Sequence, residues 1–308
     1  MSIPNIFLYF MGSVYSPMYS YTNLFTNLLP GVLVYFVYLI TFTPLPSYFV
    51  TLQIDWRKRW PFILCSLFIG QLLVVLGFVL YYICYPSDVS WSMDKEVLQY
   101  KIELSDNRSD SEIKFQIVYN SFLTVVGAPL TYFGMVFLCE LGLRGYLLIS
   151  IASHVHPAVA NIITSFIQIA VYAVYDGLSI NNYYSYQYIF ASAFMRFSQA
   201  LLLGDVMIKS GNVFAPAFVS AAFIKCSSLF SVFLSPYAYL NNILLGPTES
   251  GVLNNLPMFL LANVLNIFNN FGDVDEITKN RDAEENGYKE IRSEFNTKND
   301  ENKPLTIN

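Results

Sequence analysis

The stretch that decides the fold is Cys139-Glu-Leu-Gly-Leu-Arg-Gly-Tyr-Leu-Leu148, which directly follows the apolar run Thr131–Leu138. Glu140 and Arg144 stand four residues apart, so a helix brings both side chains onto one face. A carboxylate and a guanidinium are costly at membrane depth unless they are paired, which makes such a pair a candidate functional site. The alternative interpretation is an ordinary interfacial salt bridge that ends a helix.

The composition predicts an all-α fold: a polytopic transmembrane helical bundle with about seven spans. The chain is 55% hydrophobic and only 13% charged, whereas soluble domains are roughly 25% charged. Apolar windows of about the length that crosses a bilayer occur at Leu24–Phe42, Pro61–Tyr85, Phe115–Leu138, Ala158–Leu178, Ile189–Ile208, Val213–Leu234 and Val252–Phe271. Pro30 and Gly31 interrupt the first window and Asn residues recur in the last, so six or eight spans stay open.

The basic residues predict the orientation of the chain. Arg57-Lys58-Arg59, flanked by Trp56 and Trp60, forms a dense basic cluster between two windows, and such loops stay in the cytoplasm. Pro86–Lys114 then lies outside or in a lumen, and its Asn107-Arg108-Ser109 triplet is a glycosylation acceptor pattern. The same layout turns Glu140 and Arg144 toward the cytoplasm. The first twenty residues lack a basic region, so no cleaved signal peptide is expected.

The remaining composition narrows the class of protein. The segment Asp273–Asn308 is rich in Asp, Glu, Asn and Lys, which predicts a disordered tail on the cytoplasmic side. The four cysteines lie in or beside apolar windows and form neither a disulfide framework nor a Cys-x-x-Cys metal pair. No extended basic region suits nucleic acid.

We expect N-terminal spans and a polar loop in residues 1–114, a core in 115–235, a span in 236–272 and the tail in 273–308.

The Glu140–Leu148 stretch resembles the first motif of the CPBP (Abi) family, which includes the type II CAAX prenyl endopeptidases and lysostaphin resistance protein A. That motif reads Glu-Glu-x-x-x-Arg and commonly continues Gly-Tyr-Leu; here Cys139 replaces its first Glu. The weaker resemblance runs on to about Phe223. It implies an intramembrane endopeptidase acting on prenylated or membrane-anchored proteins, with Glu140 activating water and Arg144 holding the site. The endoplasmic reticulum is compatible with that resemblance.

The two later family motifs are degenerate in this chain. Where the family has Phe-x-x-x-His, the chain reads Tyr172-Ala-Val-Tyr-Asp176, which places Asp176 as the third candidate catalytic residue; a turn-capping role is the alternative. The lead-in to the third motif, Ile208-Lys-Ser-Gly-Asn-Val-Phe-Ala-Pro216, matches well. The family's His then falls near Ser220 or Ala221 and its Asn near Ile224 or Lys225.

These departures predict no bound metal or other cofactor, although zinc would be the metal implied by the resemblance. The only histidines, His154 and His156, lie in one short connection, whereas a metal needs at least three converging ligands. An interfacial pair of histidines is the simpler interpretation.

Two functional hypotheses follow from this sequence. One is a CPBP-type endopeptidase that uses Glu140, Arg144 and Asp176. The other, which the lost motif residues favour, is a non-catalytic scaffold that binds a lipid, a lipidated peptide or a partner helix. An unrelated seven-span receptor or transporter is a third class, for which the sequence carries no signature. The bilayer is the expected partner in every case.

Overall fold

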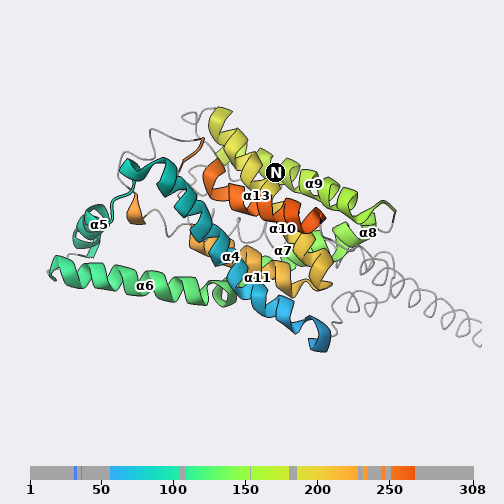
Figure 1. Cartoon of the computed structure of the whole chain (residues 1–308), viewed down its shortest axis with the longest axis horizontal. Helices are drawn as coiled ribbons and strands as arrows, with labels where there is room; N and C mark the ends of the chain where they lie inside the picture. Colours follow the sequence, from blue (N-terminus) through green and yellow to red (C-terminus); the bar gives the residue numbers. More distant parts are fainter. Residues whose placement is uncertain are drawn as a thin grey trace, which may run out of the picture.

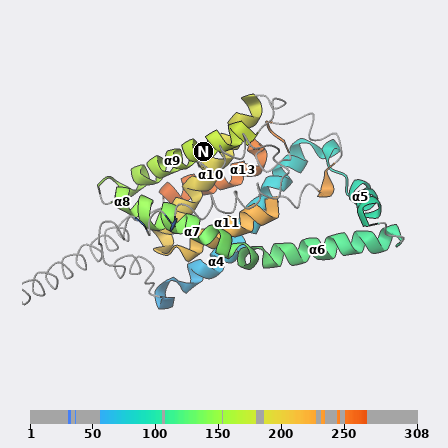
Figure 2. The ribbon, with the colours of Figure 1, turned by 180° about the vertical axis from the view of Figure 1, so that it is seen from behind.

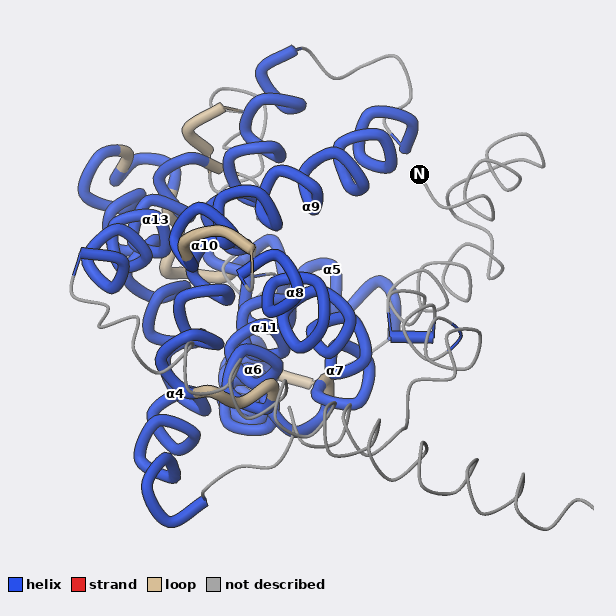
Figure 3. The backbone as a smooth tube through the Cα atoms, turned by 90° about the vertical axis from the view of Figure 1, so that its right-hand side faces the viewer, coloured by secondary structure: helices blue, strands red, loops and turns tan. Residues whose placement is uncertain are grey.

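The computed structural model describes residues 31–32, 36, 56–104, 108–152, 154–179, 186–227, 232–234, 244–246 and 251–267. This part of the chain is all-α, as predicted: helices are joined by short connections and the described residues contain no β-strand (Figure 3). One isolated antiparallel bridge joins Val89 to Leu234.

The elements follow the predicted apolar windows closely. In chain order they are α4 (Trp56–Cys84), the 3₁₀ turn η1 (Pro86–Asp88), α5 (Asp94–Leu104), α6 (Asp110–Thr131), α7 (Phe133–Glu140), the π-helix η2 (Leu141–Leu148), α8 (Ile149–Ala152), α9 (Pro157–Ser179), α10 (Tyr186–Ser210), α11 (Phe214–Ser227) and α13 (Val252–Ile267). Six of the seven windows contain described helices, but the Phe115–Leu138 window is divided: α6 ends at Thr131 and α7 begins at Phe133. The Leu24–Phe42 window and the tail lie almost wholly outside the described residues.

Two expectations about boundaries are wrong. Arg57-Lys58-Arg59 lies in the first turn of α4 rather than in a loop. The helix α11 ends at Ser227, short of the predicted Leu234, and Phe233 and Leu234 lie in a turn and a bridge. The helix α6 continues across the expected division between residues 114 and 115, and the division into domains stays a prediction.

The helix α11 lies at the centre of the bundle and contacts α4, α6, α7 and α10 (Figure 1). The helix α13 packs between α4 and α10, and α9 packs on α10. The largest apolar cluster joins α4, α10, α11 and α13, with Leu73, Leu202, Val219, Phe223 and Met258 among its members. The helix α4 therefore belongs to the same core as the later helices.

A proline break in α6 is repaired by a side chain from α4. Pro129 has no N–H, so the helix cannot bond the carbonyl of Val125 four residues earlier. Gln71 Nε2 donates to that carbonyl oxygen at 3.3 Å. Side-chain donors of this kind make proline tolerable in helices that lie in a membrane.

Within the described residues, two helices, over Trp60–Cys84 and Ile189–Ser210, are long and apolar enough to cross a membrane. Shorter apolar helical segments occur at Pro157–Ala170, Phe214–Ser227 and Val252–Ile267. At 1.5 Å per residue, α11 alone is about 21 Å long, shorter than the roughly 30 Å hydrocarbon layer. The number of spans therefore stays a prediction.

The distribution of polar and apolar residues is inverted relative to a soluble domain. On α9 the side chains of Asn161, Thr164, Ser165 and Gln168 are buried, whereas those of Ile162, Ile163, Phe166 and Ile167 are exposed. Large exposed apolar patches mark membrane or protein contacts. On this helix the polar side chains face the other helices and the apolar side chains face outward, a distribution that suits an apolar environment around the bundle.

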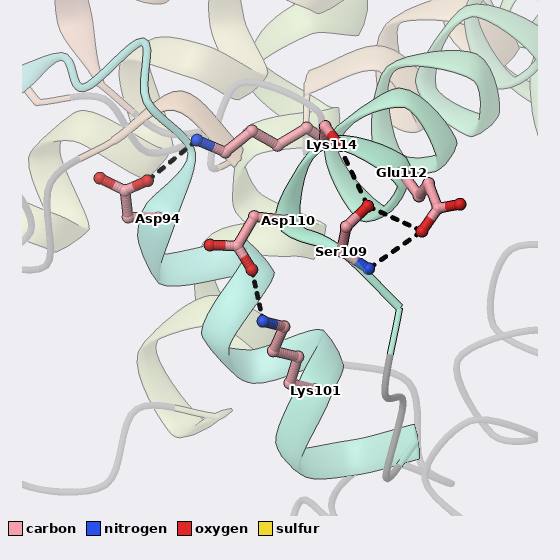
Figure 4. A network of polar contacts seen from close by, with 7 residues as sticks. Asp94, Lys101, Ser109, Asp110, Glu112 and Lys114 are labelled. Carbon is pink, nitrogen blue, oxygen red and sulfur yellow. Dashed lines mark hydrogen bonds and ion pairs between the residues drawn. The ribbon is translucent and has the colours of Figure 1, made fainter.

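In contrast to the exposed apolar face of α9, the region where α5 meets the start of α6 exposes charged and polar side chains (Figure 2). We call this region the polar corner. Lys114 pairs with Asp94 at 3.1 Å, and Lys101 pairs with Asp110 (Figure 4). Ser109 and Glu112 form a capping box: the Ser109 N–H and hydroxyl both donate to Glu112 Oε2, at 3.0 and 2.7 Å.

Candidate functional site

Glu140 is the last residue of α7 and Arg144 lies within the π-helix that follows it. Arg144 Nη1 lies 3.1 Å from Glu140 Oε2, and the two residues are only 1% and 3% exposed. The predicted pairing and burial are thus confirmed, and the pair is not at the surface of a helix end. Whether either residue is catalytic stays a prediction.

The wide π-helical turn of η2 presents Arg144 to the bundle interior. π-helical turns are rare and frequently occur at functional sites. The glycine at position 145 permits the turn to pack closely: a β-carbon there would lie 2.9 Å from Val213 Cγ2, in the connection between α10 and α11. The glycine that follows Arg144 in the motif therefore has a packing role at this position.

Arg144 joins two further helices to this centre. Its Nη2 donates to Oε1 of Gln168 on α9 and, at 3.4 Å, to the carbonyl oxygen of Ala200 on α10. Its Nε is buried without a hydrogen-bond partner among the described residues. One guanidinium therefore connects three elements, and it does so at a high cost of desolvation.

The third-motif segment also reaches Glu140. Gly211, with φ of 59°, ends α10 in the left-handed conformation, and Asn212 Oδ1 accepts from the Phe214 N–H at 2.8 Å to begin α11. This turn directs α11 so that the Ser220 side chain hydrogen-bonds the Glu140 carboxylate. Ser220, one of the two positions predicted for the family's His, is thus brought to the site.

On α9, the residue beside the first motif is Tyr172. Its hydroxyl lies 3.6 Å from Sγ of Cys139, and its ring lies 4.6 Å from the guanidinium carbon of Arg196 on α10. Asp176 lies one turn further along α9, and its side chain falls outside the described part of the structure. The predicted participation of Asp176 is therefore untested.

A second polar contact lies between α9 and α10. Asn161 Nδ2 donates to the Leu201 carbonyl at 2.9 Å and to Asp205 Oδ1 at 3.0 Å, and both Asn161 and Asp205 are buried. Gly204 makes room for the amide, because a β-carbon at that position would overlap Asn161 Oδ1.

The two histidines are exposed in the connection before α9. The His156 ring accepts from the Ala158 N–H at 3.4 Å and so caps that helix. Among the described residues, no group of three His, Cys, Asp or Glu side chains is arranged to hold a metal ion.

Sequence reasoning missed Gln168, Arg196 and the Asn161–Asp205 contact. A signal was available for two of them: residues 161, 164, 165, 168 and 172 are polar or amphipathic at helical spacing within an otherwise apolar segment. Nothing in the spacing of α10 predicts which of its polar residues meets which partner.

Comparison of the chain with protein-family models, with curated proteins and with solved structures gave no match.

Proposed function

We propose that this chain is a multi-pass membrane protein of the CPBP type in which the Glu140–Arg144 centre holds a binding scaffold together and does not hydrolyse peptides. The ligand class implied by the resemblance is a prenylated or otherwise membrane-anchored peptide, or a partner helix. The CPBP assignment rests on the motif residues alone.

The observation that supports the proposal is that the buried Glu140–Arg144 pair is surrounded by contacts with other residues of the protein. Arg144 forms an ion pair with Glu140 and donates hydrogen bonds to Gln168 and the Ala200 carbonyl, and Glu140 also takes a hydrogen bond from Ser220. Those contacts join η2 to α9 and α10, and α7 to α11. A pair used in this way stabilises one arrangement of helices, whereas a general base must exchange protons with water or substrate.

The residue types at the centre support the same reading. Activation of a water molecule for peptide hydrolysis needs a base and a group that stabilises the oxyanion. The described contacts of Glu140 are with a permanently charged Arg and with a serine hydroxyl. Arg144, the group that could stabilise an oxyanion, is already engaged by Glu140, Gln168 and the Ala200 carbonyl, and the serine hydroxyl is not a base near neutral pH.

The multi-pass placement is supported by the inverted distribution of polar and apolar side chains on α9 and by the two helices of spanning length. A tag placed after Asn308 tests the orientation. Protease added from the cytoplasmic face should remove the tag, because Arg57-Lys58-Arg59 and the tail share that face in the proposed layout. Digestion from the luminal or external face would contradict the layout.

The functional test uses purified protein in proteoliposomes and a farnesylated C-terminal peptide. We expect the peptide to bind without being cleaved. Glu140→Gln should leave product formation at background and lower the thermal stability, whereas Glu112→Gln, the same change in the exposed capping box, should have little effect on either. Turnover that disappears in Glu140→Gln while the protein stays folded would establish the alternative, an active endopeptidase.

That alternative has one observation in its favour. Glu140 and Arg144 from the first motif and Ser220 from the third-motif segment meet at one buried point, as the residues of an active site would. The assay above separates the two functions, because only the peptidase requires the carboxylate of Glu140 for turnover.

A further inference from the structure

The helix α6 runs along one edge of the bundle, and its N-terminal part extends beyond the other helices together with α5 (Figures 1 and 2). It packs on α11 with one side. Its other sides expose large apolar residues along nearly the whole length: Phe115, Val118, Tyr119, Phe122, Leu123, Val126 and Leu130. Two polar residues interrupt this apolar surface.

These two residues are Gln116 and Asn120. Gln116 Nε2 donates to Asn120 Oδ1 at 3.0 Å on the exposed part of the helix. No charged residue occurs between Lys114 and Glu140, and Asn120 lies about 9 Å along the helix axis from Lys114. In the proposed membrane placement, an exposed amide at that depth faces hydrocarbon, where it lacks water as a partner.

The polar pair belongs to a regular stripe along α6. Gln116, Asn120, Leu123, Gly127 and Leu130 follow one another at steps of four, three, four and three residues, and we call them the α6 seam. This is the heptad spacing at which two helices interlock side by side. The position of Gly127 in the seam suits close approach of two backbones, as small residues do in membrane helix pairs.

We propose that the α6 seam is a self-association surface that binds the same seam of a second copy of this chain. Two copies in one membrane share an orientation, so a closed dimer has its twofold axis along the membrane normal. The two α6 helices then run parallel and each seam residue meets its own counterpart. An Asn side chain suits such a pairing, because its amide both donates and accepts and so complements itself.

The proposal rests on the membrane placement described above. Cysteine substitutions in α6 test the self-association and the membrane placement separately. Asn120→Cys is made in a chain whose exposed cysteines, Cys65 and Cys84, are replaced by Ala, leaving the buried Cys139 and Cys226. The matched control is Phe122→Cys, an exposed site at nearly the same depth but about 160° away around the helix. An oxidant is added to native membranes.

We expect disulfide-linked dimers with Asn120→Cys and few with Phe122→Cys. Equal linking at both positions, or linking at neither with a thiol protected from water-soluble maleimide, would overturn the dimer while leaving the membrane placement intact. Rapid maleimide labelling of Asn120→Cys without oxidation would instead place α6 in water and overturn both.

A second variant measures the contribution of the amide. Asn120→Leu keeps the helix apolar and removes only the polar pairing. Hydrogen bonds of about 0.6 to 2 kcal/mol between membrane helices correspond to a loss of about threefold to thirtyfold in the dimer association constant, measured by single-molecule photobleaching in dilute vesicles. Asn120→Gln should retain most of the association. Unchanged association in Asn120→Leu would overturn the role of the seam.

Discussion

Two ion pairs in the described part of the chain have the same length but opposite surroundings. Arg144 and Glu140 meet at 3.1 Å in the buried centre, and Lys114 and Asp94 meet at 3.1 Å on the exposed polar corner (Figure 4). The side chains of the first pair are 1% and 4% exposed, whereas those of the second are 33% and 74% exposed. The distance between charges therefore says little about what each pair does for the fold.

The difference in surroundings decides the energetics. A buried pair has lost its hydration, so removal of one partner leaves an uncompensated charge in the interior. The charges of an exposed pair are hydrated whether or not they are paired, so the pair contributes at most about 1 kcal/mol to the free energy of unfolding. The buried pair should consequently control the arrangement of helices, and the exposed pair should only adjust a local turn.

The largest expected effect is that of Glu140→Ala. The variant leaves Arg144 buried and without its carboxylate, which should lower the free energy of unfolding by about 3–5 kcal/mol, measured by reversible denaturation in mixed micelles. A Glu140→Leu/Arg144→Met double variant, which removes both charges and keeps apolar volume, should recover much of that loss. If the single and double variants were equally destabilised, the charge of Arg144 would not be the cause.

The next effect concerns the second polar contact of the interior. Gly204→Ala places a methyl group against the Asn161 amide, and overpacking of this kind typically costs about 1–3 kcal/mol. Gly134→Ala in α7 is the matched control, because a β-carbon there meets no atom within 4 Å. Thermal melting should separate the two variants clearly, and equal melting temperatures would place Asn161 elsewhere.

A smaller effect is expected at the polar corner, from Ser109→Ala. The hydrogen bond that the Ser109 hydroxyl donates to Glu112 is lost, and a typical hydrogen bond contributes about 0.5–1.5 kcal/mol. Ser109→Thr retains a hydroxyl donor at this position and should be close to the native protein. Amide hydrogen exchange in the first turn of α6 measures the change locally. Unaltered exchange in Ser109→Ala would show that Glu112 alone is sufficient there.

The smallest effect is the pH dependence of the exposed pair. The hydrogen bonds from Ser92 and then from Lys114 hold the pKa of Asp94 below its ordinary value. A lowered folded-state pKa contributes stability above the unfolded-state pKa, and that contribution is lost as the pH falls through the folded value. The Asp94 carboxyl signal, followed by NMR, should therefore titrate below about pH 4, and Lys114→Met should move its midpoint upward.

The sequence was sufficient for the coarse architecture and for the centre of the candidate site. Apolar windows located the described long helices, because a helix interior in an apolar environment needs a continuous run of apolar residues. The Glu140–Arg144 pairing followed from a spacing of four. Such inferences succeed where contacts are local.

The remainder depends on contacts between distant residues. Gln168 and Ser220 reach the pair only because α9 and α11 pack as they do, and the π-helical turn leaves no periodic trace in eight residues. Similarly, Leu234 belongs to the predicted Val213–Leu234 window but forms a bridge with Val89 and is not part of α11. Hydropathy reports the continuous apolar run and cannot report where tertiary contacts divide it.

The inverted face of α9 has a consequence for biosynthesis. The buried Asn161 amide finds its partners, the Leu201 carbonyl and Asp205, on α10, the helix that follows α9 in the chain. Within lipid, the same amide would lack a partner until α10 is present. In the proposed membrane placement, α9 and α10 would therefore enter the bilayer together as a hairpin.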